Sequence, residues 1–294
     1  MQFASCLYIC TCILQAKLQI KNKTSKMKKN ILVTGASSGF GLLVANELHK
    51  RGYNVIGTSR NPEKNQSSLP FKLLALDITD DNSIKSFRKQ LFTEIKQLDV
   101  LINNAGFYLS GLAEETSVEQ GKQQLETNFW GTVKLTNEIL PYFRKQRFGK
   151  IITVGSIMGL ISLPGGAYYA ASKHALEGFF RALRFELKEF NIKVSMIEPV
   201  GFKTNIITNS KVAENKINDY NEYRTTLADY TKDLFKKSQE PTPVIKTILK
   251  VVENETPNFN HPVGKGSSLF PAIQFFSFKT FENSVIKNIN KFKK

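Results

Sequence analysis

The chain has 294 residues, 41% of them apolar, which suits one large α/β domain with a substantial core. Its formal net charge is +16, but six lysines fall within residues 17–29 and the other basic residues are scattered, so nucleic-acid binding is not expected. The three cysteines lie at Cys6, Cys10 and Cys12, where a zinc site would lack a fourth ligand nearby, so no metal centre is expected. A body without cysteine suits a reducing compartment, and we expect a cytoplasmic protein.

Residues 1–26 precede the expected domain. The apolar run at 3–16 has the length of a secretory h-region, but no Lys or Arg comes before it and no clean small-x-small cleavage site follows. It is too short to span a bilayer. Met27 stands close before the first expected strand and would be a natural start. We therefore expect residues 1–26 to be a disordered extension or an over-long translation start.

The first expected strand, 30–33, runs into a glycine-rich turn and then into a helical pattern. The turn reads Thr34-Gly35-Ala36-Ser37-Ser38-Gly39-Phe40-Gly41. Such a turn lets backbone amides and the positive end of a helix approach a pyrophosphate, although a plain tight turn would also use glycines. Its spacing differs from the G-x-G-x-x-G of many dinucleotide folds. We predict a cofactor site at Gly35, Ser37, Ser38, Gly39, Phe40 and Gly41.

The second expected strand, 53–58, indicates which dinucleotide binds. Residues 55–60 include no Asp or Glu, and Arg60 stands just after the strand. In a dinucleotide fold a carboxylate near this place takes the ribose hydroxyls of NAD, whereas an arginine accommodates the 2′-phosphate of NADP. NADP is therefore predicted over NAD, with Arg60 and Ser37 on the phosphate. The alternative is that Arg60 is a solvated loop residue.

The fourth strand of the expected sheet ends in a pair of asparagines. The elements before this pair are expected as strands at 71–76 and 98–102 and a helix at 83–97. The pair belongs to the sequence Asn103-Asn104-Ala105-Gly106. Adjacent asparagines at a strand end offer amides that can tie neighbouring strand ends together and reach a ribose, although a plain turn would also favour Asn and Gly. We predict that these four residues contribute to the cofactor site.

Polar residues recur at a further strand end and inside a long helix. The helix is expected at 118–145 and carries Asn128 and Gly131 in its interior, where propensity favours neither. A local kink or a close helix crossing would also explain them. A fifth strand at 148–155 ends at Ser156. Because parallel strands linked by helices collect ligands at their carboxyl ends, these strand-end motifs are expected at one site.

A helix expected at 167–190 carries the sequence Tyr168-Tyr169-Ala170-Ala171-Ser172-Lys173. Residues four apart share a helix face, so Tyr169 and Lys173 point the same way, whereas Tyr168 has no lysine four residues on. A nearby ammonium favours the phenolate, and we expect Lys173 to lower the pKa of Tyr169 from its usual value of about 10. The pair would be a tuned general acid and base. The alternative is an ordinary amphipathic helix with a snorkelling lysine.

Taken in order, these motifs resemble those of the short-chain dehydrogenase/reductase family. The family's patterns T-G-x-x-x-G-x-G and N-N-A-G correspond to residues 34–41 and 103–106, and its four catalytic residues to Asn128, Ser156, Tyr169 and Lys173. The resemblance covers residues 30–264 and is to the main branch, with its hydroxysteroid- and retinol-dehydrogenase-like members. It implies one Rossmann-type, doubly wound parallel sheet flanked by helices, in a catalytic domain at 27–264.

The resemblance also implies a role for each catalytic residue. Ser156 would polarise the substrate carbonyl, and Tyr169 would donate the proton. Lys173 would hold the nicotinamide ribose as well as tune the tyrosine. Asn128 would hold a water molecule that links the lysine to solvent.

Further cofactor residues follow from the same resemblance. Asp77-Ile78 stands where the family holds the adenine ring, although Asp77 would also suit a helix cap. Pro199, Gly201 and Thr204 belong to a segment similar to E-P-G-x-x-x-T, in which the threonine meets the cofactor. The chain departs from this pattern at Val200, where glycine is usual.

The remainder of the chain is expected to form the substrate side. A sixth strand at 192–197, a helix at 241–253 and a last strand at 261–264 complete the domain. The polar segment 205–240 is expected to be a mobile helical lid. The basic and aromatic tail, 265–294, could complete the substrate pocket, contact a partner or dock on a membrane surface, and the sequence does not choose among these.

The predicted function is NADP-dependent hydride transfer between nicotinamide and a carbonyl or secondary alcohol, chiefly reduction of an apolar ketone or aldehyde. Met158, Leu160, Ile161 and Leu163 could form an apolar pocket wall or could be core. The alternatives are a 3-oxoacyl carrier-protein reductase, since the positive charge suits an acidic carrier, and a non-catalytic dinucleotide-sensing protein of the same fold. The family implies a homodimer or homotetramer with contacts on the helices at 118–145 and 167–190. No membrane span is expected, and a peripheral membrane contact stays open.

Overall fold

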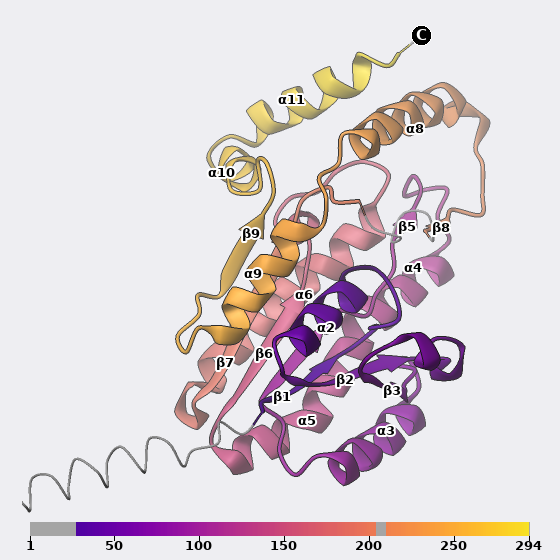
Figure 1. Cartoon of the computed structure of the whole chain (residues 1–294). Helices are drawn as coiled ribbons and strands as arrows, with labels where there is room; N and C mark the ends of the chain where they lie inside the picture. The colour runs from indigo at the N-terminus through magenta and orange to yellow at the C-terminus, as the bar shows by residue number, and fades with distance from the viewer. Residues whose placement is uncertain (1–27, 204–209, 294) are drawn as a thin grey trace, which may run out of the picture.

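The computed structural model describes residues 28–203 and 210–293 (Figure 1). Their main sheet has seven parallel strands in the order β3-β2-β1-β4-β6-β7-β9. These are β1 (Asn30–Val33), β2 (Asn54–Ser59), β3 (Lys72–Ala75), β4 (Val100–Asn103), β6 (Gly149–Val154), β7 (Ile192–Pro199) and β9 (Asn260–Val263). The chain runs outward from β1 to β3 and then outward from β4 to β9, so the strand order reverses between β1 and β4. The predicted doubly wound Rossmann-type sheet is confirmed.

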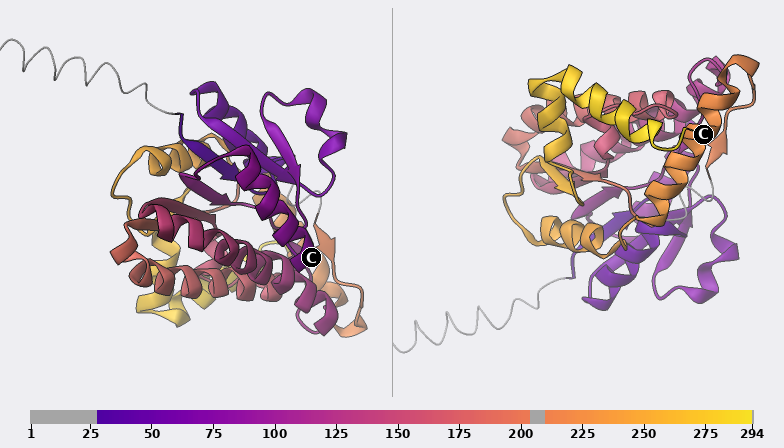
Figure 2. Two further views of the ribbon diagram at one scale, coloured as in Figure 1. Left: turned by 90° about the horizontal axis from the view of Figure 1, so that it is seen from below. Right: turned by 90° about the horizontal axis from the view of Figure 1, so that it is seen from above.

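Helices cover both faces of the sheet (Figures 1 and 2), and the alternating side chains of the strands belong to two core layers. Ile31 and Val33 of β1 belong to the layer with α2 (Gly39–Lys50) and α9 (Thr242–Glu253). Leu32 belongs to the opposite layer, which is formed with α3 (Asp81–Glu94), α5 (Thr132–Gln146) and α6 (Ala167–Glu186). A strand buried on both faces therefore needs an uninterrupted apolar run, and 31–33 supplies one.

The long helix predicted at 118–145 is present but interrupted. α4 (Val118–Leu125) passes into a π-helical segment, Glu126–Gly131, before α5 begins. A Cβ at Gly131 would lie 2.6 Å from the carbonyl oxygen of Ile78, so glycine permits this helix to approach the segment after β3. A π-helical segment therefore stands where a kink was considered, and Gly131 permits a close approach to the segment after β3 instead of a helix crossing. Single π-helical turns of this kind are frequent at functional sites.

The C-terminal tail forms two helices, α10 (Leu269–Phe276) and α11 (Phe278–Asn290). The inner face of α11 packs on the chain through Phe281, Val285 and Ile289. Its partners are the segment 157–163 and Leu227 of α8 (Asn221–Lys236). The apolar residues of 157–163 thus pack beneath the tail as a small core. No helix in the described part of the chain combines the length and hydropathy needed to cross a membrane.

Candidate active site

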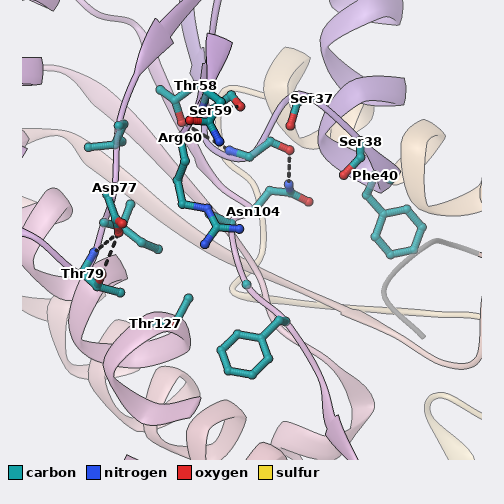
Figure 3. Close-up of a pocket in the computed structure, with 18 of the residues that line it drawn as sticks. Ser37, Ser38, Phe40, Thr58, Ser59, Arg60, Asp77, Thr79, Asn104 and Thr127 are labelled. Carbon is teal, nitrogen blue, oxygen red and sulfur yellow. Dashed lines mark hydrogen bonds between the residues drawn. The ribbon is translucent and has the colours of Figure 1, made fainter. Parts of the chain in front are cut away.

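The carboxyl ends of β1 to β4 border a cavity of about 780 Å³ (Figure 3). It lies where the strand order reverses, which is the usual ligand site of open α/β sheets. The predicted cofactor residues that line it are Gly35, Ser37, Ser38, Gly39, Phe40, Arg60, Asp77, Ile78, Asn104, Ala105 and Gly106. Residues from four separate stretches of the sequence therefore meet at one cavity.

The glycine-rich turn uses its glycines for two different reasons. Gly35 and Gly39 have φ values of +64° and +55°, in the left-handed region that other residues rarely adopt. A Cβ at Gly41 would lie 2.4 Å from both Asn104 Nδ2 and the carbonyl oxygen of Gly35, so Gly41 serves close packing. α2 begins at Gly39, and its unpaired amides stand at the cavity wall. A pyrophosphate fits such a cradle.

Thr34 ties this turn to the end of β4, although it was not among the predicted site residues. Its hydroxyl accepts hydrogen bonds from the amides of Asn104 (2.8 Å) and Ala105 (3.0 Å). Asn104 Nδ2 in turn donates to the carbonyl of Thr34 at 2.9 Å. The position of Thr34 directly before the first glycine was the signal that could have found it.

Asn103 does not line the cavity, so its predicted contact with the cofactor stays a prediction. The side chain is buried, and its Nδ2 donates to the hydroxyls of Thr136 (3.1 Å) and Thr153 (3.3 Å). β4 ends at Asn103, and the residues that follow it, from Asn104 to Phe107, line the cavity. Asn103 therefore joins β4 to β6 and α5, and of the two asparagines only Asn104 borders the cavity.

Arg60 and Asp77 stand on neighbouring strand ends. Figure 3 shows Arg60 extending into the cavity between Asp77 and Asn104. Burial raises the pKa of Asp77, but hydrogen bonds from the hydroxyl (2.7 Å) and amide (2.9 Å) of Thr79, together with the Arg60 charge, outweigh it and lower that pKa. The alternative role of Asp77 as a helix cap is wrong, because Asp80 caps α3.

Asn128 links the segment after β4 to α6. Its Oδ1 accepts from the amide of Phe107 and its Nδ2 donates to the carbonyl of the same residue, both at 3.0 Å. The Nδ2 also donates to Ser172 Oγ at 3.2 Å, and Ser172 Oγ donates to the carbonyl of Tyr169 at 2.7 Å. Asn128 is thus two hydrogen bonds from the Tyr169 backbone.

Ser156, Tyr169 and Lys173 come together beside the end of β6. The hydroxyl of Ser156 forms a hydrogen bond with that of Tyr169. Lys173 Nζ donates to the carbonyl of Val154 at 3.0 Å and lies 5.6 Å from the centre of the Tyr169 ring. Tyr108 packs edge-on against Tyr169 with ring centres 4.8 Å apart. The predicted trio is therefore assembled in space.

The pKa of Tyr169 is shifted in the opposite direction from the one expected. Burial raises the pKa of Tyr169 to about 12, and the hydrogen bond from Ser156 opposes this only in part. Burial likewise lowers the pKa of Lys173 to about 8, against the opposing charge of Glu177. The predicted lowering of the Tyr169 pKa by Lys173 is not found in this arrangement, because burial of the phenol dominates and the opposing effect comes from Ser156. At neutral pH Tyr169 carries its proton.

The segment after β7 accommodates its unusual valine by a shift of one residue. Val200 continues the pairing with β9, where its amide donates to the carbonyl of Val263 at 2.9 Å. Gly201 then adopts a φ of +49°, which a glycine permits. Pro199 and Gly201 are absent from the wall of the 780 Å³ cavity. Thr204 lies outside the described residues, so its predicted contact with the cofactor stays a prediction.

Residues 29–215 match the family model described as short chain dehydrogenase. The chain belongs to the short-chain dehydrogenase/reductase family. It is therefore an oxidoreductase that acts on carbonyl or CH–OH groups with a nicotinamide dinucleotide. The family match ends before α8, so that helix and the C-terminal helices lie beyond it.

Proteins with similar sequences or structures agree with this assignment. A 3-ketodihydrosphingosine reductase of Bacteroides thetaiotaomicron is 38% identical over 239 residues, which cover 81% of this chain and 81% of that protein. A short-chain dehydrogenase from Streptomyces avermitilis superposes with a TM-score of 0.78 at 28% identity, over 90% of this chain and 98% of its own. The structure of ElxO with NADP bound gives a TM-score of 0.69 at 27% identity, over 82% and 99% of the two chains.

This dehydrogenase has a second cavity, of about 870 Å³, which is lined in part by Tyr108, the residue that packs against Tyr169. The short strands β5 (Leu109–Ser110) and β8 (Lys211–Val212) and helix α8 border it. Its apolar wall includes Leu112, Pro164, Phe202, Leu227 and Phe235. Met158, Leu160, Ile161 and Leu163 line neither cavity, so the core alternative for them is the one observed.

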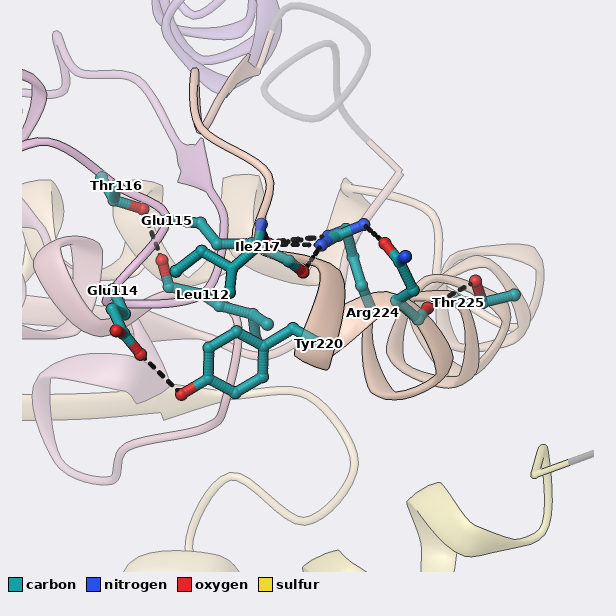
Figure 4. A network of polar contacts seen from close by, with 9 residues as sticks. Leu112, Glu114, Glu115, Thr116, Ile217, Tyr220, Arg224 and Thr225 are labelled. Atoms are coloured by element: carbon teal, nitrogen blue, oxygen red, sulfur yellow. Dashed lines mark hydrogen bonds and ion pairs between the residues drawn. The ribbon is translucent and has the colours of Figure 1, made fainter.

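One ion pair holds α8 beside this second cavity (Figure 4). Glu115 is 2% exposed and accepts hydrogen bonds from Nε and Nη2 of Arg224 and from the amide of Ile217. The Arg224 hydrogen bonds are the main cause that lowers the pKa of Glu115. Arg224 Nη2 also donates to the carbonyl of Ile217 at 2.8 Å. A two-pronged contact of this kind fixes both position and angle, so α8 is anchored to the segment after β5.

Two acidic residues of the dehydrogenase have buried side chains close to each other. Glu177 lies on α6, one helical turn beyond Lys173, and Glu198 lies on β7. Asn260 Nδ2 donates to Glu177 at 3.1 Å and to Glu198 at 2.6 Å, and the amide of His261 donates to Glu198 at 2.8 Å. Burial, and then the charge of Glu177, raise the pKa of Glu198 to about 8. Burial also raises the pKa of Glu177. Two carboxyl groups this close cannot both ionise easily, so the pair retains a proton at neutral pH.

We expect this retained proton to make folding stability depend on pH. The pKa of Glu198 rises from 4.5 to about 8 on folding, so its stabilising contribution is fully present below 4.5 and is lost as pH rises through 8. The slope is at most about 1.4 kcal/mol per pH unit. Urea denaturation at several pH values measures the free energy of unfolding. Between pH 4.5 and 8 this free energy should decrease less steeply with pH in Glu198→Gln than in the wild type, whereas the exposed control Glu119→Gln should behave as the wild type does. Equal slopes in wild type and Glu198→Gln would contradict the pKa assignment.

Proposed function

We propose that this dehydrogenase reduces an apolar ketone or aldehyde with NADPH and that Tyr169 donates the proton. The observation that carries this proposal is the arrangement around Tyr169: its phenol is buried, Ser156 lies beside it, and Lys173 Nζ lies 5.6 Å from its ring centre. A protonated phenol is suited to protonate the oxygen of a carbonyl as it is reduced.

NADP is proposed as the cofactor on two grounds. Arg60 borders the 780 Å³ cavity, and the residues at the end of β2 that share this wall, Thr58, Ser59 and Asn61, include no carboxylate. An arginine at this place suits a 2′-phosphate, whereas a carboxylate would repel it. The second ground is the structural likeness to ElxO with NADP bound.

Each residue of the proposed catalytic set has a role that follows from its contacts. When bound, NADPH supplies the hydride. The Ser156 hydroxyl stabilises the negative charge that develops on the substrate oxygen, and Tyr169 passes its proton to the same oxygen. Lys173 then stabilises the tyrosinate left behind. Asn128 positions α6 through Ser172, and the water molecule it was predicted to hold remains part of the proposal.

An apolar substrate is proposed because the second cavity has a largely apolar wall and shares Tyr108 with the environment of Tyr169. The relative named 3-ketodihydrosphingosine reductase supports a ketone with a long hydrocarbon portion. One observation favours the carrier-protein alternative: Lys216 and Lys232 line this cavity and form no ion pair with the described residues. An acidic carrier could approach such lysines.

The assembly and location of the enzyme are also proposals. We propose a homodimer or homotetramer in which the α4–α5 and α6 regions make contact. Trp130 and Phe185 support this, because they are 48% and 75% exposed on these helices and a subunit contact would cover them. The predicted cytoplasmic location stays a prediction, as do the expectations for residues 1–26, which lie outside the described residues.

The test is to follow NADPH and NADH oxidation with a panel of carbonyl compounds. The panel contains long-chain ketones, aldehydes, a steroid ketone and a 3-oxoacyl thioester. We expect turnover of apolar ketones with a preference for NADPH of at least about tenfold. Turnover of the thioester alone would favour the carrier-protein reductase. Dinucleotide binding without any turnover would instead support the dinucleotide-sensing alternative.

A further inference from the structure

We propose that the turn between α10 and α11 docks on the surface of an anionic lipid bilayer. Phe275, Phe276 and Phe278 lie in and beside this turn, and we call them the aromatic patch; Leu269 is exposed at the start of α10. Phe275 and Phe276 are each 84% exposed, Phe278 is 62% exposed and Leu269 is 59% exposed. Three phenylalanines within four positions thus expose most of their surface to solvent. Contiguous apolar surface of this kind marks a contact with a partner or a membrane.

The aromatic patch is the outer side of helices whose inner sides are already occupied. α11 buries Phe281 and Ile289 against the chain, and α10 is held by Ile273 and by a 3.2 Å hydrogen bond from Gln274 Nε2 to the carbonyl of Leu160. Figures 1 and 2 show α10 and α11 at the outer edge of the molecule. Among the described residues, nothing covers most of the surface of these rings, although the helix pair that carries them is packed on the chain.

The charges around the aromatic patch indicate lipid as the occupant. Residues 265–294 contain a single acidic residue, Glu282, and the lysines Lys265, Lys279, Lys287, Lys291, Lys293 and Lys294. Within the described part of the chain, Lys265, Lys279 and Lys287 form no ion pair. Phenylalanines flanked by lysines suit the boundary between acyl chains and anionic headgroups, where both the apolar and the electrostatic contributions are favourable.

A second copy of this chain is a less suitable occupant. A two-fold contact brings the same patch of both copies together, so lysines would face lysines with only Glu282 to neutralise them. The lipid contact also agrees with the position of the second cavity. α11 packs on Leu227 of α8, and Leu227 lines the 870 Å³ cavity. Docking through the turn would hold this side of the enzyme close to the bilayer. The docking itself does not depend on the proposed substrate or cofactor.

Vesicle co-sedimentation of the full chain tests the proposal. Vesicles of phosphatidylcholine mixed with phosphatidylglycerol are compared with vesicles of phosphatidylcholine alone. We expect the wild type to bind the anionic vesicles and the triple variant Phe275→Ser, Phe276→Ser, Phe278→Ser to bind at least about tenfold more weakly. The control is Leu43→Ser, which removes an exposed apolar side chain on α2, outside the aromatic patch, and should bind as the wild type does. Thermal unfolding and soluble-ketone turnover of the triple variant should be unchanged.

A second variant tests the electrostatic part. Lys279→Glu combined with Lys287→Glu should weaken binding to the anionic vesicles, and added salt should weaken wild-type binding in the same direction. Wild-type affinity in the triple variant, or equal wild-type binding to both vesicle types, would overturn the proposal. A triple variant that lowers the molecular mass in sedimentation analysis, with no vesicle binding by the wild type, would identify the patch as a contact between copies.

Discussion

Tyr169→Phe is expected to lower kcat for ketone reduction by at least about 100-fold and to leave NADPH binding unchanged. The substitution removes the phenolic oxygen, and with it both the proton and the hydrogen bond to Ser156. The ring remains, so the edge-on contact with Tyr108 and the packing of α6 are kept. Steady-state turnover and a fluorescence titration with NADPH measure the two quantities separately.

Tyr168→Phe is the matched control, because Tyr168 is the adjacent residue of the same helix. Its ring packs over Gly121 of α4, where an added Cβ would lie 2.3 Å from the Tyr168 ring. A contact of this kind uses the ring and not the hydroxyl. Tyr168→Phe should therefore retain wild-type turnover. Normal turnover in Tyr169→Phe, or an equal loss in both variants, would refute Tyr169 as the proton donor.

Arg60→Ala is expected to weaken NADPH binding by about 10- to 100-fold and to change NADH binding little. A hydrogen bond to a charged group contributes about 1.5–3 kcal/mol, and each 1.4 kcal/mol is about tenfold in affinity. NADH has no 2′-phosphate and so loses nothing comparable. Because Arg60 extends into the cavity from the end of β2, its removal should not disturb the sheet. Titrations with both dinucleotides measure the change.

Lys72→Ala is the control for the loss of a positive charge near the cavity. Lys72 lies on β3, is ion-paired with Glu94 and does not line the cavity. Its removal changes the net charge by the same amount as Arg60→Ala but should leave NADPH affinity within about twofold, since its charge is screened and already paired. If Arg60→Ala and the wild type bind NADPH with equal affinity, Arg60 is only a solvated loop residue.

Much of the site could be predicted from the sequence because its parts are local. The glycines at 35 and 39 are required by backbone conformation, which the residue type reveals directly. The helical spacing of Tyr169 and Lys173 places them on one face before any tertiary contact is known. Strand ends gather at one edge of a parallel sheet, so the places of Asn104 and Ser156 directly after strands predicted that both lie at that edge.

The tertiary structure alone decided what depends on burial and on distant partners. Asn103 faces Thr136 and Thr153 instead of the cavity, and Thr34 ties β1 to β4, because contacts across the sheet decide which side chains meet. The pKa of Tyr169 rises because the fold removes water from the phenol, which no spacing of residues reveals. The sequence by itself thus determined the family, the sheet and the Tyr169–Lys173 pair. The packing around that pair determined which of the two groups holds its proton most firmly.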